Sequence, residues 1–306
     1  MHNRGALVAP CQPGASSTSV LTRFRGRDTS SPLSPRMLGN LLFIALLTGP
    51  MAPGAALAWT PAMDARVSHE ALRLMPSSLR SVLKRHTRAI ESGAAAAAGV
   101  EDSSQHSLDE GQSAPSAADR LVALVDETVS LIDAHAPFSV VADRFGAIAH
   151  VVGDLNNPLQ VSETDPREPD FADDYVAYVE HSLPRYRLVF YGWSDPLIRT
   201  DSSASHPAEP ELKNLAVGAA RRAREQYHPI CAAYDPANPE PFERRFDDRS
   251  LAFGIGSLAW SHTVTGTARV WLHVWQRAQG DTRGTPYLKA AIPGVSPRLD
   301  KNKARE

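Results

Sequence analysis

The chain has 306 residues, of which 42% are hydrophobic, 22% charged and 7% aromatic, and its formal net charge is -2. This mixture is typical of a globular protein and excludes a wholly disordered or collagen-like chain. The balance of 32 basic and 34 acidic residues also lacks the dense positive charge that non-specific nucleic-acid binding uses. We therefore expect no stable nucleic-acid complex.

The N-terminal region has the pattern of an export signal. Residues 1–36 are rich in Ser, Pro, Gly and Arg, and we expect a disordered extension there, either a mistaken translation start or a long n-region. Within residues 37–58 a short apolar run, Leu41–Leu47, is followed by small residues that end at Ala58. This pattern predicts a signal peptide cleaved between Ala58 and Trp59, with an uncleaved membrane anchor as the alternative. The mature protein is then expected in the periplasm or outside the cell.

The rest of the chain predicts a succession of amphipathic helices, because apolar residues recur at spacings of three and four. The predicted helices are Ser68–His86 with a break at Pro76, Leu121–Ala136, Val140–Leu155, Phe171–His181, Glu211–Tyr227 and Ser250–Gln279. Polar, Pro-rich connectors separate them, and the run Ala94–Ala98 is interpreted as a loop or a frayed helix end. We expect an all-α protein, with one multi-helix domain over residues 59–296 and a disordered tail over 297–306.

His150 and Asp154 are the strongest candidates for metal ligands in this pattern. They are four residues apart in a predicted helix, so their side chains lie one turn apart on the same face. Imidazole nitrogen and carboxylate oxygen are both ligands of zinc. A His and an Asp at this spacing also occur as a solvated pair on a helix surface, so the spacing alone leaves both interpretations open.

The segment around this pair resembles a known family. It reads Phe-Gly-x-x-x-His-x-x-Gly-Asp-Leu-x-x-Pro over residues 145–158, and a His-x-x-Asp element lies at residues 106–109. Together with a tryptophan at the expected cleavage site, these motifs resemble those of the bacterial zinc-dependent phospholipase C family and the related fungal single-strand-specific nucleases. The resemblance covers residues 59–193 and implies a largely helical fold and phosphodiester hydrolysis.

The resemblance also implies a centre of two zinc ions that share one carboxylate, since an anion between two cations offsets their repulsion. The ligands that it assigns are His106, His150, Asp154 and Asp102 for one ion, and the amine and carbonyl of Trp59, His69 and the shared Asp154 for the other. Asp102 would also orient or deprotonate the attacking water. The neighbouring Glu101 is the alternative residue for that role.

The third zinc site of the family is altered in this sequence. The resemblance places there a His two residues after the Pro of the main motif and a downstream His-x-x-x-Glu pair, where this chain has Gln160, Asp170 and Asp174. Gln is a poor zinc ligand beside carboxylates and no His is left. We therefore expect the site to be absent or to prefer a hard cation with oxygen ligands.

These observations predict an exported, monomeric, zinc-dependent phosphodiester hydrolase similar to phospholipase C. Its expected substrate is a phospholipid, reached during transient contact with a membrane surface, or another phosphodiester. Two alternatives stay open: a single-strand nuclease, and a metal-binding relative with impaired catalysis. A nuclease needs aromatic side chains on which bases stack. The candidates for that role are Tyr175, Tyr178, Tyr186, Phe190, Tyr191 and Trp193, although the spacing of the first two is also typical of core packing.

Overall fold

The computed structural model describes residues 59–99, 116–161, 165–193, 197–198, 209–234 and 246–288. Contacts between residues divide the chain into two units, Met1–Pro50 and Met51–Glu306, and every described residue belongs to the second. The expectations for the signal peptide and for the tail therefore lie outside the described residues.

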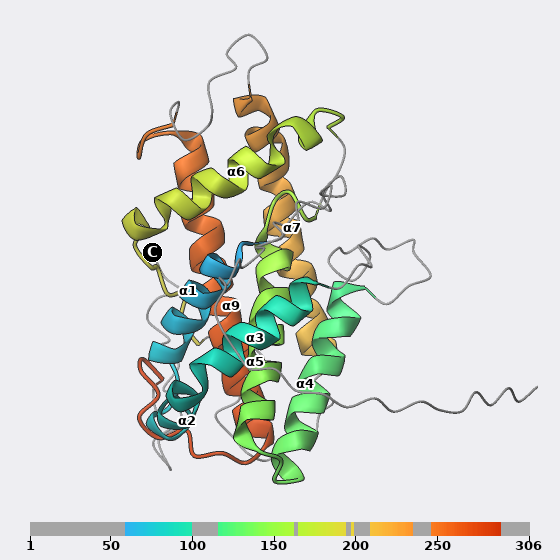
Figure 1. The fold of residues 1–306 in the computed structure, drawn as a ribbon, viewed down its shortest axis with the longest axis vertical. Helices are drawn as coiled ribbons and strands as arrows, with labels where there is room; N and C mark the ends of the chain where they lie inside the picture. Colours follow the sequence, from blue (N-terminus) through green and yellow to red (C-terminus); the bar gives the residue numbers. More distant parts are fainter. Residues whose placement is uncertain are drawn as a thin grey trace, which may run out of the picture. The chain divides into compact units, whose positions relative to one another are not determined.

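All regular elements in these ranges are helices (Figure 1), so the predicted all-α class is confirmed. In chain order they are α1 (Pro61–Arg73), α2 (Ser77–Leu83), η1 (Lys84–His86), α3 (Thr87–Ala98), α4 (Ala117–Asp133), α5 (Phe138–Asn156), α6 (Glu168–Ser182), η3 (Leu183–Arg185), α7 (Glu209–Ala233) and α9 (Leu251–Arg277). In the part of the chain that the structure describes, we find no helix with the length and apolar character needed to span a bilayer.

Side-chain caps start three of these helices. The hydroxyl of Thr60 accepts a hydrogen bond from Met63 N at 3.4 Å, and the proline that follows it fits the first helical position of α1. Ser116 and Asp119 form a reciprocal capping box at α4, and Ser250 caps α9. The early start of α1 has a consequence for the site, because it brings Asp64 into the first turn of a helix.

The helix α5 is the one around which the others pack. Every residue from Phe145 to Asn156 is buried, as expected for a helix that is covered on all sides. The helices α1, α3, α4, α7 and α9 all contact it, and Figure 1 shows α3 crossing α5. Trp271 of α9 donates from its indole N–H to the carbonyl oxygen of Phe145 at 3.0 Å. Because α5 is covered in this way, any ionisable residue on it is removed from water and needs a partner.

The N-terminal helices differ from the prediction in two respects. The predicted helix Ser68–His86 is divided into α1, α2 and η1, with the expected break at Pro76, and α1 begins at Pro61. A further helix, α3, covers Thr87–Ala98. The sequence predicts no helix for its first part and indicates a loop or a frayed helix end for its last part, Ala94–Ala98. Alanine has the highest intrinsic helix propensity, and its small side chain permits a close approach to α5.

Candidate metal centre

A buried imidazole between two carboxylates lies at the centre of the fold. His150 on α5 is fully buried, and its Nδ1 lies 2.9 Å from Oδ2 of Asp64 on α1. Its Nε2 lies 3.3 Å from Oδ2 of Asp154, one turn further along α5. Both acids are buried as well. The three side chains therefore form a chain of acid, imidazole and acid without access to water, which we call the His150 cluster.

Trp59 packs against the same turn of α5. Its indole N–H donates to the carbonyl oxygen of Gly153 at 2.7 Å, and the residue is buried. A Cβ on Gly153 would lie 2.8 Å from Cδ1 of the indole, so the glycine of the motif is what admits the ring. The structure thus places Trp59 beside the residue that precedes Asp154.

The charges of the cluster act on one another. Burial by itself lowers the pKa of His150, but the charge of Asp154 and the hydrogen bond to Asp64 outweigh burial, so the pKa is raised. Burial raises the pKa of Asp64, and the hydrogen bond to His150 opposes this only in part. Arg120 of α4 adds a guanidinium whose charge interacts with Asp154, although burial lowers its pKa.

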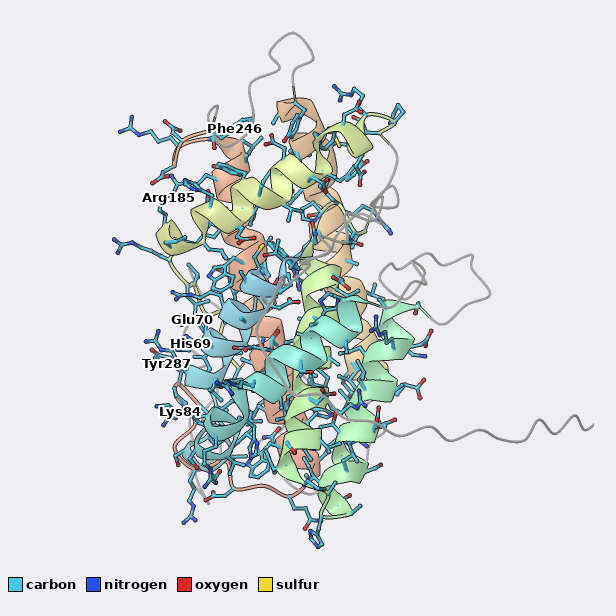
Figure 2. The ribbon with its side chains drawn as sticks, viewed as in Figure 1. His69, Glu70, Lys84, Arg185, Phe246 and Tyr287 are labelled. Atoms are coloured by element: carbon cyan, nitrogen blue, oxygen red, sulfur yellow. The ribbon has the colours of Figure 1, made fainter. Side chains whose placement is uncertain are left out.

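Not every predicted ligand joins the cluster. Trp59, His150 and Asp154 are brought together, whereas Asp102, its alternative Glu101 and His106 lie outside the described residues. The structure does not bring His69 to the others, because the side chain is 62% exposed and its Nδ1 lies 3.6 Å from Oε1 of Glu70. Figure 2 shows His69 and Glu70 together on α1.

The sequence interpretation missed two members of this centre. Asp64 occupies an inward position of α1, in line with Met63, Val67 and Ala71, which are also buried. An acid at a buried position of a helix is the signal that could have identified it, and Glu70 of the same helix shares that signal. Arg120 lies in the first turns of α4 and has no comparable sequence signal.

The residues aligned with the third zinc site have different surroundings from one another. Gln160 is buried, Asp170 is exposed, and Asp174 accepts a hydrogen bond from the Tyr234 hydroxyl at 2.6 Å. The structure therefore gives Asp174 a role in joining α6 to the end of α7.

The fold is similar to that of alpha-toxin from Clostridium perfringens. The structure compared is that of the toxin from avian strain SWCP, with a TM-score of 0.51 and 13% sequence identity. The match covers 74% of this chain and 66% of the toxin chain, so the chain spans slightly less than two thirds of the toxin's length. No family profile and no curated protein sequence matches the chain. At this low sequence identity, the similarity to the toxin is a similarity of fold alone.

The donor types of the His150 cluster suit a divalent cation. They are one imidazole and two carboxylates, all buried, and Oδ1 of Asp64 has no hydrogen-bond partner among the described residues. Each ring nitrogen of His150 faces its own carboxylate, however, and within the described ranges no group of three or more His, Cys, Asp or Glu is placed to hold an ion. The described donors are thus a partial ligand set.

Proposed function

We propose that this protein is an exported, metal-dependent phosphodiester hydrolase of the phospholipase C kind. The observation that carries the proposal is the buried chain of Asp64, His150 and Asp154. Buried charges are costly unless they are paired or bind a metal, and such perturbed groups are concentrated at functional sites. The motif over residues 145–158 and the likeness to alpha-toxin, which suggests a phospholipase C-like fold, support the same activity.

In this proposal the protein binds two zinc ions. Their ligands are His150, Asp154, His106, Asp102 and Trp59. Zinc would supply an activated water and a polarised phosphoryl oxygen. Asp64 would act through His150, because its carboxylate accepts a hydrogen bond from Nδ1 and so leaves Nε2 directed toward Asp154. Asp102 would orient the attacking water.

Arg120 would stabilise the negative charge on the phosphoryl group. Its Nη2 donates to the carbonyl oxygen of Ala97 at 3.0 Å, which fixes the guanidinium, while its buried Nη1 has no hydrogen-bond partner among the described residues. A fixed guanidinium beside a metal centre is a strong ligand for phosphate oxygens.

The proposed substrate is the phosphodiester of a phospholipid, reached by transient contact of a monomer with a membrane surface. Export would remove the segment that ends at Ala58 and expose the amine of Trp59. N-terminal sequencing of the exported protein is expected to start at Trp59. A different first residue would remove the amine from the proposed ligands.

Hydrolysis of a chromogenic phosphodiester by the mature protein tests the proposal. We expect turnover that a chelator abolishes and zinc restores, and that Asp154→Asn reduces by at least about a hundredfold, as loss of a ligand does. Asp173→Asn is the matched control, because that carboxylate is exposed on α6 and is not aligned with a predicted metal ligand. Turnover that is indifferent to the chelator, or equal in the two variants, would contradict the proposal.

The same preparation distinguishes the alternatives. Single-stranded DNA cleavage that exceeds phospholipid hydrolysis would favour the nuclease. Of the aromatic residues predicted for base stacking, Tyr175, Tyr178, Tyr186 and Trp193 are buried, whereas Tyr191 is 39% exposed. Zinc that binds without any turnover would favour the metal-binding relative with impaired catalysis.

A further inference from the structure

A polar cavity lies on the face of α5 that is turned away from the His150 cluster. Asn156 and Asp154 are two residues apart on a helix and therefore project in roughly opposite directions. Asn156 lines a cavity of about 170 Å³ between α5, α7 and α9. The other lining residues are Tyr191, Leu215, Ala219, Arg222, His262, Thr265, Gly266 and Arg269.

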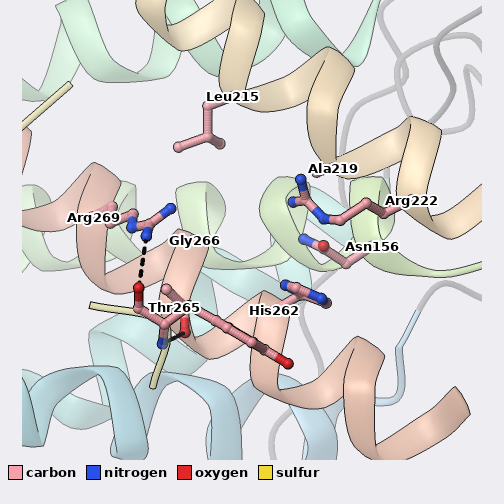
Figure 3. Close-up of a pocket in the computed structure, with 9 residues that line it drawn as sticks. Asn156, Leu215, Ala219, Arg222, His262, Thr265, Gly266 and Arg269 are labelled. Atoms are coloured by element: carbon pink, nitrogen blue, oxygen red, sulfur yellow. Dashed lines mark hydrogen bonds between the residues drawn. The ribbon is translucent and has the colours of Figure 1, made fainter. Parts of the chain in front are cut away.

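The charged side chains of this cavity are all basic. Arg222 comes from α7 and Arg269 from α9, and no carboxylate is among the described residues that line the cavity. Figure 3 shows Arg222, Asn156 and His262 on one side in that view and Arg269 on the other. Both guanidinium groups line one small cavity, and the charge of each acts on His262 inside it.

Two of the basic groups are held in place. Nε of Arg269 donates to the carbonyl oxygen of Gly192 at 3.0 Å, and Nη2 donates to that of Tyr191 at 3.2 Å. The His262 ring stacks on Tyr191, with centroids 4.4 Å apart and planes 9° apart. The bonds to the two carbonyl oxygens fix the plane of the Arg269 guanidinium, which lowers the loss of side-chain freedom when a ligand binds.

The pKa of His262 is changed by the charges around this cavity. Burial and the charges of Arg222 and Arg269 lower the pKa of His262 to about 4, so the ring is neutral at neutral pH. An anion between the guanidinium groups would offset that field and raise the pKa of His262 again.

We propose that this cavity binds a phosphoryl group, and that Arg222 and Arg269 are its principal ligands. Guanidinium groups match the geometry of tetrahedral oxyanions through paired N–H donors, which favours phosphate over a monovalent halide. The volume is large enough for a phosphoryl group with a small substituent. This site is separate from the proposed hydrolytic centre and does not depend on its activity.

Calorimetric titration of the full mature protein with inorganic phosphate, at constant ionic strength, tests the site. We expect saturable binding that Arg222→Gln weakens at least tenfold. Arg221→Gln is the matched control, since Arg221 is the adjacent exposed arginine of α7 and does not line the cavity. Equal affinity in both variants, or no binding to the wild type, would overturn the proposal.

Two further measurements locate the ligand and identify its source. Phosphate binding that survives Asp154→Asn, together with a His262 imidazole signal that titrates at higher pH when phosphate is present, places the anion in this cavity. A His262 titration that phosphate leaves unchanged would count against the proposal. Binding of vesicles that contain phosphatidic acid, with loss in Arg222→Gln alone, would identify a lipid headgroup as the source, whereas phosphate binding without vesicle binding would identify a soluble phosphate.

Discussion

At the scale of single residues, the interior of the molecule holds one imidazole and two carboxylates in contact with each other and away from water. Removing one partner of such a buried group leaves the other with an uncompensated desolvation penalty. His150 depends on this balance, because its two ring nitrogens face Asp64 and Asp154.

We therefore predict that Asp64→Ala lowers the free energy of unfolding by about 3 kcal/mol, measured with denaturant in the presence of a chelator. Asp64→Asn should lower it less, because the amide oxygen can still accept from Nδ1 of His150. Asp170→Ala, which removes an exposed carboxylate, should change it little. An effect of Asp64→Ala as small as that of Asp170→Ala would contradict this interpretation of the cluster.

His273 gives a second prediction, on pH. Burial lowers its pKa to about 4, although its Nδ1 bonds to the carbonyl oxygen of Leu197 at 3.1 Å. In the unfolded chain the pKa of His273 has its ordinary value of 6.5. Between pH 6.5 and about 4, His273 is therefore protonated in the unfolded chain and neutral in the folded chain. His273 alone should therefore lower the free energy of unfolding by about 3 kcal/mol as the pH falls through that window. His262, whose pKa is also lowered to about 4, should add to this fall.

Denaturant unfolding of variants at several pH values checks this prediction. His273→Gln should make the decrease between pH 6.5 and 4 shallower by about that amount, whereas His228→Gln, which changes an exposed histidine, should retain the wild-type decrease. A slope in His273→Gln that equals the wild-type slope would show that other groups cause the acid sensitivity.

At the scale of elements, the contact between α3 and α5 depends on small residues. A Cβ on Gly93 would lie 1.8 Å from the carbonyl oxygen of Asp143, and a Cβ on Gly146 would lie 1.9 Å from that of Ile90. Both oxygen atoms belong to the backbone, so they cannot move away as the end of a flexible side chain could. The sequence analysis missed α3 for the same reason, because a helix that packs through Ala and Gly lacks the periodic large apolar residues that indicate a helix face.

We predict that Gly146→Ala lowers the free energy of unfolding by about 3 kcal/mol or more, since the two helices must separate. Gly254→Ala is the control within α9, where a Cβ would meet no atom within 4 Å. That variant should raise stability by about 0.5–1 kcal/mol through the better helix propensity of alanine. Similar effects of the two substitutions on thermal unfolding would contradict the close α3–α5 contact.

At the scale of the whole molecule, the sequence predicted the helical class and the placement of His150 and Asp154 one turn apart on one helix, because both depend on local patterns. The His150 and Asp154 spacing lies within one helix, and the motif beside it needs no knowledge of the fold. Asp64 meets His150 only when α1 packs on α5, so their pairing depends on tertiary structure. The polar cavity lined by Arg222 and Arg269 also depends on tertiary structure, since these residues come from two helices far apart in the sequence.

The central claim is that the His150 cluster belongs to a metal centre. The most direct test is the zinc content of the mature protein, measured by elemental analysis in the wild type and in His150→Ala and Asp154→Asn, with helical content checked by circular dichroism. We predict at least one tightly bound zinc ion in the wild type and its loss in both variants while the fold is retained. A wild type that binds no zinc, or folded variants that keep as much as the wild type, would contradict the account.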